Sequence, residues 1–161
     1  MNAIDLLKQQ HREVDVLFER AARAKPGEKV GLLGQLAEKL TLHARIEEQH
    51  FYPFARSKGI QDMVDHSLQE HAEAKRLIAN LLQSKRNDPK LDSALARLQQ
   101  SVQQHVKEEE EKLFPLLVGV ASAEELDGLG DTLQQSADEL SNQELLQMAE
   151  SEGEALPPVQ S

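Results

Sequence analysis

The chain has 161 residues, a formal net charge of −10 at pH 7 and no cysteine. This length suffices for one domain with a hydrophobic core, and the lack of cysteine excludes disulfides, zinc–thiolate sites, iron–sulfur clusters and cysteine nucleophiles. Helix-forming residues dominate, no run of alternating β-branched residues occurs, and no apolar run could span a membrane. We therefore expect an all-α protein, and the absence of a signal segment at the start favours the cytoplasm.

The negative charge lies near the end of the chain. Lys112 is the last basic residue, and ten of the 28 acidic residues follow it, so residues 1–112 hold 18 acids and 18 bases. No basic stripe is present, so we expect neither nucleic acid nor a membrane as partner. A protein could bind the acidic tail.

The spacing of apolar residues predicts four long helices. The first starts with Asn2 as N-cap and ends at the break Pro26-Gly27. The other three are expected over residues 28–56, 62–85 and 89–118, the last with Asp88 as its N-cap. Pro53 should kink or loosen the end of the second helix, because it cannot donate a backbone hydrogen bond.

On each predicted helix, apolar residues recur every three or four positions and form a line that faces the core, here called the seam of that helix. Polar residues interrupt every seam. The same spacing continues the seam through His50 and Phe54 on the second helix, and through Leu113 and Leu116 on the fourth. The polar residues at the centre of the seams are His11, His43, Glu47, His71, His105 and Glu109.

One short motif occurs twice, at residues 43–53 and 105–115, and reads H-x-x-x-E-E-x-x-x-aromatic-Pro. A His and a Glu four residues apart lie on one face of a helix. A lone histidine precedes each copy, by 32 residues for His11 and by 34 for His71. The chain therefore reads as two helical hairpins, which predicts an up-down-up-down four-helix bundle with six inward-pointing polar side chains.

The domain organisation follows from these patterns. Residues 1–118 form the expected bundle, and residues 119–150 an acidic C-terminal extension of one or two helices. Two capping-box patterns, starting at Ser122 and Ser141, mark the helix starts in that extension. We expect residues 151–161 to be a disordered tail, because they have little apolar surface to bury.

A metal site explains the six residues better than a polar core does. A lone buried histidine is usually hydrogen-bonded and structural, but a buried carboxylate needs a counter-charge, and Lys75 is the single basic candidate on the seams. Imidazole and carboxylate without thiolate suit iron, manganese or zinc. Two octahedral ions bridged by both carboxylates and an oxide or hydroxide would leave about two positions open, suited to O2, peroxide or nitric oxide.

Residues 1–118 resemble the hemerythrin-like (HHE cation-binding) family in this pattern of histidines, glutamates and aromatic-Pro pairs. The resemblance implies a non-haem di-iron site in a four-helix bundle, with both carboxylates bridging two Fe ions. Oxygen-carrying hemerythrins have H-x-x-x-H on the third helix, where this chain has Lys75 after His71, and their last-helix acid lies one residue later than Glu109. One histidine fewer favours reaction or sensing over oxygen carriage. The related iron–sulfur repair proteins carry an N-terminal cysteine segment that this chain lacks, which argues against a repair role.

Other polar residues are expected to play supporting roles. Glu48 and Glu110 are interpreted as partners of a ligand histidine or as exposed residues. His50 could be a proton donor beside the site or a seventh ligand, but a solvated or structural role is preferred because its repeat mate is Lys112. His66 is interpreted as a helix-start or surface residue. Tyr52 could reach the site with its hydroxyl, but core packing is the preferred interpretation because its repeat mate is a phenylalanine.

The sequence thus favours a di-iron protein that binds, senses or handles O2, nitric oxide or peroxide. The alternatives are a di-iron oxidase or peroxide-consuming enzyme, and an iron-homeostasis or stress-response protein. A metal-free helical interaction module with a polar core also stays open.

Overall fold

The structure, a computed structural model, describes residues 1–84 and 88–154. Within these ranges the chain forms helices and short turns without strands, which confirms the all-α prediction. None of the described helices is both long and apolar enough to cross a membrane. The elements in order are α1 (Ala3–Arg23), α2 (Pro26–Ile46), η1 (Glu47–Phe51), α3 (Tyr52–Ser57), α4 (Asp62–Gln83), α5 (Leu91–Glu108), η2 (Glu109–Leu113), α6 (Phe114–Val120), α7 (Ala123–Asp138) and α8 (Asn142–Glu154).

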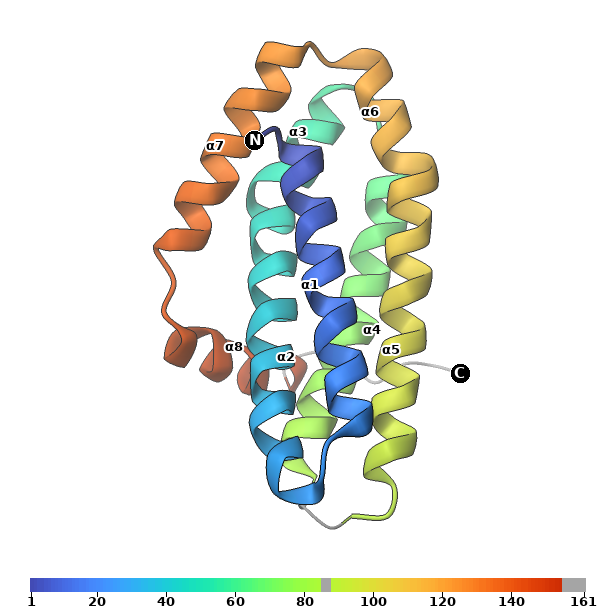
Figure 1. Ribbon diagram of the computed structural model, residues 1–161. Coiled ribbons are helices and arrows are strands. Elements are labelled where there is room, and N and C mark those ends of the chain that lie inside the picture. The colour runs from blue at the N-terminus through green and yellow to red at the C-terminus, as the bar shows by residue number, and fades with distance from the viewer. Residues whose placement is uncertain (85–87, 155–161) are drawn as a thin grey trace.

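Helices α1, α2, α4 and α5 form the up-down-up-down bundle (Figure 1). α1 packs against α2, and α4 packs against α5, so each predicted hairpin is a packed pair. Further contacts join α2 to α4 and α1 to α5, and these close the ring of four helices. The bundle is the expected hemerythrin-like architecture.

The observed helix starts agree in part with those predicted from the sequence. Asn2 caps α1, accepting a hydrogen bond from the Asp5 amide at 2.8 Å. Pro26 does not simply break the chain but occupies the first turn of α2, where its missing N–H leaves no intrahelical bond unmade. Asp88 accepts from the Lys90 amide at 2.9 Å in a turn before α5, which begins at Leu91 instead of residue 89.

A π-helical turn lies within each copy of the repeated motif. In η1 the Tyr52 amide bonds to the Glu47 carbonyl, five residues back, and in η2 the Phe114 amide bonds to the Glu109 carbonyl. The chain continues directly into α3 and α6, so the loosening expected at Pro53 takes the form of an inserted residue ahead of the proline.

The inserted residues rotate the core-facing side of the chain beyond each glutamate. After Glu47 the fully buried residues are Phe51 and Tyr52, whereas His50 and Phe54 are only partly buried. After Glu109 the core position is Leu117, at 0% exposure, and Leu116 is 51% exposed. The seam positions predicted for His50, Phe54 and Leu116 were therefore wrong, because the prediction assumed an uninterrupted α-helical period.

Two apolar clusters lie on either side of the polar residues. The first contains Phe18, Leu36, Leu40, Ile78, Leu98 and Val102 among others. The second lies around the π-helical turns and contains Leu7, Ile46, Phe51, Val64, Phe114 and Leu117 among others. Together the two clusters exclude water from both sides of the layer that holds the histidines and glutamates.

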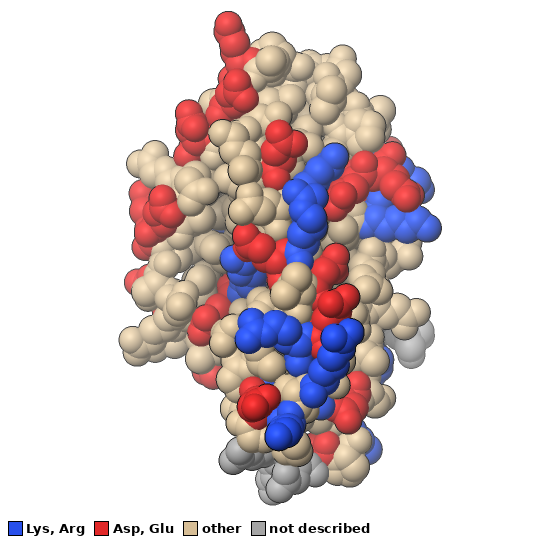
Figure 2. All heavy atoms as spheres, viewed as in Figure 1, with Lys and Arg blue, Asp and Glu red and all other residues tan. Residues whose placement is uncertain are grey.

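The acidic C-terminal extension folds back onto the bundle. α7 packs along α1, and α8 lies across α2 and α4, where Ala149 joins the first apolar cluster. Acidic side chains line α7 at the left of Figure 2. Both predicted capping boxes are formed, at Ser122 and at Ser141. α8 runs to Glu154, into the segment expected to be disordered, and residues 155–161 lie outside the described part.

Close contact between α7 and the start of the chain predicts that Gly130 has no room for a side chain. A Cβ at this position would lie 2.2 Å from the Met1 carbonyl oxygen and 2.9 Å from the Ala3 nitrogen. We expect Gly130→Ala to destabilise the protein by about 1–3 kcal/mol, since backbone must move to accommodate it.

The matched control is Gly128→Ala on the same helix, where nothing lies within 4 Å. That substitution should be neutral or stabilise the protein by about 0.5–1 kcal/mol, because alanine favours helix. Urea unfolding of both variants measures the difference, and equal stabilities would contradict the proposed close packing.

Candidate metal centre

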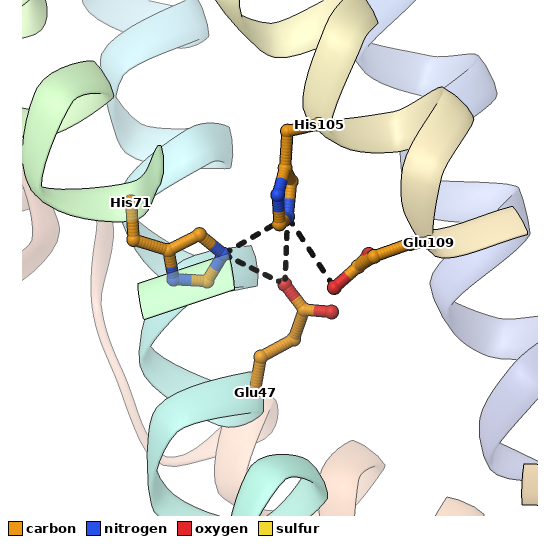
Figure 3. A group of neighbouring side chains, drawn as sticks. All are labelled: Glu47, His71, His105 and Glu109. Carbon is orange, nitrogen blue, oxygen red and sulfur yellow. Dashed lines mark hydrogen bonds and ion pairs between the residues drawn. The ribbon is translucent and has the colours of Figure 1, made fainter. Parts of the chain in front are cut away.

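The structure brings all six predicted site residues together in one buried layer. Glu47 and Glu109 are 0% exposed, and the four histidines are between 4% and 7% exposed. The residues come from six elements, namely α1, α2, α4, α5 and the two π-helical turns that begin at the glutamates. Figure 3 shows four of them, from the two hairpins, pointing toward one another.

The histidines form two pairs through their Nε2 atoms. The Nε2 atoms of His11 and His43 lie 3.2 Å apart, and those of His71 and His105 lie 3.1 Å apart. Each pair joins the lone histidine of a hairpin to the motif histidine of the same hairpin. The four Nε2 atoms thus converge on the centre of the bundle.

The two carboxylates lie between these pairs. Glu47 Oε1 is 3.0 Å from His43 Nε2 and 3.1 Å from His71 Nε2, so a single oxygen contacts both pairs. Glu109 places Oε1 3.3 Å from His11 Nε2 and Oε2 3.3 Å from His105 Nε2. Each carboxylate is therefore positioned to bridge the two halves of the site.

Each histidine is fixed by a hydrogen bond at its outer nitrogen, Nδ1. The partners are Glu110 for His11, Gln10 for His43, Glu48 for His71 and Glu70 for His105, at distances of 2.7, 2.7, 2.9 and 2.9 Å. A hydrogen bond donated from Nδ1 leaves Nε2 with its lone pair facing inward, which is the arrangement of metal-ligating histidines. Glu110 and Glu48 are thus the hydrogen-bond partners of His11 and His71.

Lys75 does not neutralise the central carboxylates. Its ammonium group donates to Glu48 at 2.8 Å, on the outer side of His71. The basic residue that the sequence offered as a structural counter-charge therefore supports the outer ring of hydrogen bonds instead.

Tyr52 reaches the centre of the site with its hydroxyl, whereas the sequence favoured a role in core packing. Its hydroxyl donates to Glu109 Oε2 at 2.6 Å and lies 3.0 Å from His71 Nε2. The π-helical turn η1 brings the residue five positions after Glu47 onto the inner face. Phe114 occupies the equivalent position in the second motif without a polar group, so the hydroxyl makes the two halves unequal.

The sequence analysis also did not identify Gln10 and Glu70. Each directly precedes the lone histidine of its hairpin and bonds the motif histidine of the same hairpin. A polar residue before both lone histidines is a repeated signal that could have identified them.

The charges of the site are strongly coupled. Burial alone would raise the pKa of the Glu47 carboxyl, but the imidazoles of His43, His105 and His71 outweigh it and hold this pKa well below its ordinary value. Burial lowers the pKa of His105, but Glu109 together with the other carboxylates raises it well above its ordinary value. Without bound metal, the carboxylates therefore favour the protonated form of the His105 imidazole.

A metal ion fits this set of donors. Glu47 Oε2 and Glu109 Oε1 are buried and accept no hydrogen bond from any described residue, and a buried carboxylate oxygen without a partner is costly. The donor atoms form two groups, and within each group they lie within 4.8 Å of one another. One group comprises Glu47, His71, His105 and Glu109, and the other comprises His11, His43 and Glu109. The two groups share Glu109, which is the arrangement expected of a bridging ligand.

A small apolar cavity of about 40 Å³ adjoins the histidines. All four imidazoles line it, but neither central glutamate nor Tyr52 does. Its remaining walls are mostly apolar side chains from the bundle helices, among them Val14, Leu40, Ala44, Ile78, Val102 and Val106. The carboxylate side of the site is packed with aromatic residues, so the histidine side is where a small molecule has room.

His50 and His66 lie away from the six residues. His50 faces α7, in a surface hollow with Thr132 and Glu139. His66 is 57% exposed and contacts Glu70 and Glu108 on the outside of the bundle. Neither histidine is therefore a ligand of the central site.

Comparisons with known proteins agree with the fold. The hemerythrin HHE cation-binding domain family matches residues 2–117. A solved hemerythrin HHE cation-binding domain-containing protein from Mycobacterium kansasii superposes with a TM-score of 0.80, at 23% identity over 95% of this chain and 94% of that one. A protein named DNA nickase from Nostoc sp. is 29% identical over 126 residues, and the chain spans only 36% of its length.

The Tyr52 hydrogen bond gives a prediction that can be tested in metal-free protein. Burial and then the neighbouring carboxylates raise the pKa of Tyr52 well above its ordinary value, so the hydroxyl keeps its proton and donates to Glu109. We expect Tyr52→Phe to reduce the free energy of unfolding by about 1–3 kcal/mol, because a buried carboxylate oxygen loses its donor.

A double-mutant cycle with Glu109→Gln separates this bond from packing. The cost of Tyr52→Phe should be smaller when residue 109 is uncharged, since charge-assisted hydrogen bonds are the stronger ones. Equal costs in both backgrounds, measured by chemical denaturation, would show that the hydroxyl contributes only through packing.

Proposed function

Because the chain belongs to the hemerythrin HHE cation-binding family, we propose that it binds a pair of iron ions and uses them to bind, sense or handle O2, nitric oxide or peroxide. The observation that carries the proposal is the fully buried pair Glu47 and Glu109, each with a carboxylate oxygen that accepts no hydrogen bond from a described residue. The four histidines complete a set of six nitrogen and oxygen donors. We place the protein in the cytoplasm as part of this proposal.

The donor types support iron. His11 and His43 would hold one ion, His71 and His105 the other, and the two glutamates would bridge them. Imidazole and carboxylate without thiolate suit iron, with manganese and zinc as competitors. Bound iron supplies redox chemistry and open coordination positions, while the protein supplies orientation and a dry cavity.

The charge of the hydrogen-bonded network favours two divalent ions. The network contains five carboxylates, those of Glu47, Glu48, Glu70, Glu109 and Glu110, and one ammonium group, that of Lys75. With neutral imidazoles it carries four negative charges, which two divalent cations balance. Ion binding therefore replaces the protons that the histidines hold in the metal-free protein.

The cavity limits what can reach the ions. At about 40 Å³, with mostly apolar walls, it accommodates a diatomic molecule or a peroxide but not a larger organic substrate. Such a molecule would approach from the histidine side, opposite Tyr52 and the glutamates.

A second candidate function is an oxidase or peroxide-consuming enzyme. The observation that favours it is the Tyr52 hydroxyl, a proton donor 2.6 Å from Glu109 and within the site. Continuous consumption of peroxide or O2 by the iron-loaded protein would support the enzyme, whereas a stable adduct without turnover would support binding or sensing.

DNA nicking is not part of the proposal. The chain spans 36% of the nickase from Nostoc, and acids balance bases over residues 1–112. The chain therefore has no excess of positive charge that would attract phosphates.

The metal content of three variants tests the proposed site. We expect about two irons per chain in protein from iron-replete cells, as two-ion sites require. His43→Ala and Glu109→Ala should each lose most of this iron, because each removes a ligand. The control is His50→Ala, since His50 lies in a surface hollow with Thr132 and Glu139.

Elemental analysis gives the iron content, and thermal melting shows whether iron stabilises the fold. Unchanged iron in both ligand variants would refute the assignment, and a folded wild-type protein without metal would favour the polar-core interpretation.

The outer hydrogen bonds give a further prediction with a neighbouring control. Glu110 bonds His11 Nδ1 at 2.7 Å, whereas the next residue, Glu111, is exposed. We expect Glu110→Ala to weaken metal binding by about 10–100-fold, the usual effect of losing such a partner. Glu111→Ala removes the same charge and should leave affinity within about twofold, because surface charges are screened. Competition with a chelator measures both, and equal affinities would mean that Glu110 does not orient His11.

A further inference from the structure

A third His-x-x-x-Glu pair lies outside the central site. His66 and Glu70 have the same spacing on α4 as the two motif pairs, and the function proposed above does not use them as ligands. His66 Nε2 lies 2.9 Å from Glu108 Oε2, on α5, and 3.6 Å from Glu70 Oε2. Donor atoms of His66, Glu70 and Glu108 all lie within 4.8 Å of one another, so they converge from two helices on one point.

This point is open to solvent. His66 is 57% exposed, while Glu70 and Glu108 are 15% and 23% exposed. A hollow of about 330 Å³ adjoins His66 and Glu108, and Asp62 and Lys112 line it as well. An ion held by three protein donors here would have room for water in its remaining coordination positions.

The electrostatics of the cluster favour a cation. Two carboxylates face a single imidazole, and they approach each other closely, which is unfavourable without positive charge between them. A protonated His66 would offset only one of the two negative charges.

We propose that His66, Glu70 and Glu108 form a peripheral site for a divalent transition-metal ion. One imidazole and two carboxylates are a donor set suited to zinc, manganese or ferrous iron, with water completing the coordination. The site is separate from the central pair and open where that pair is enclosed. It does not depend on the function proposed for the central site.

Glu70 connects the two sites. Its Oε1 bonds His105 Nδ1 at 2.9 Å, while its Oε2 faces His66. One carboxylate therefore serves as a ligand of the peripheral ion and as the outer partner of a central histidine. The test leaves Glu70 intact, because its loss would disturb both sites.

Titration of the metal-loaded protein with zinc tests the proposal. Isothermal titration calorimetry should detect one zinc ion per chain beyond the central ions, and elemental analysis should show that the central ions are retained. His66→Ala and Glu108→Gln should each weaken this binding at least about tenfold, since each removes one of three ligands. The control is His50→Ala, because His50 is also a surface histidine but lies in a different hollow.

Two results would overturn the proposal. One is zinc binding that His66→Ala and Glu108→Gln leave unchanged. The other is zinc uptake only in exchange for the central ions. Failure of the central assignment would show differently, as low iron content in the untreated protein with the peripheral zinc site still present.

Discussion

The burial of two carboxylates is the constraint on which the rest of this structure depends. Glu47 and Glu109 are fully enclosed between two apolar clusters, where an unpaired negative charge would cost several kcal/mol. Four imidazoles surround these charges, and each imidazole is held by a bond at its other nitrogen. Without the carboxylates, the inward-facing Nε2 atoms of the histidines would lose their charged partners. Without the histidines, burial would prevent the carboxylates from staying ionised in this layer.

The π-helical turns connect this constraint to the backbone. Both begin at the buried glutamate and end before the aromatic-Pro pair, so each inserts one residue where the helix leaves the site. The proline in the following turn has no N–H, which makes a regular α-helical ladder incomplete at this place. The rotation then buries large aromatic residues on the carboxylate side. The cavity is left on the histidine side, so the same insertion determines where a small molecule can approach.

Much of this could be predicted from the sequence, because the signals were periodic. The six site residues lie at positions where helical seams and the repeated motif coincide, and the hairpin repeat predicts the bundle. Leu116 was misplaced because a π-helical insertion leaves no trace in hydrophobic spacing. For Tyr52, the phenylalanine at the equivalent position of the second motif suggested packing and gave no sign of the role of the hydroxyl. The docking of α7 and α8 could not be predicted either, since an amphipathic pattern shows which face is buried but not against what. The close contact of Gly130 with the N-terminus could not be predicted for the same reason.

The two halves of the site are related by the repeat but are chemically different. His43 is bonded by a neutral amide, Gln10, and burial lowers its pKa, whereas His105 is bonded by the Glu70 carboxylate and its pKa is raised. A carboxylate partner makes an imidazole a stronger donor to a cation. Tyr52 adds a hydroxyl to the half that contains His71 and His105, and Phe114 adds none to the other. Two ions bound here would therefore have unequal surroundings, with the stronger imidazole donors and the single proton donor on the same ion.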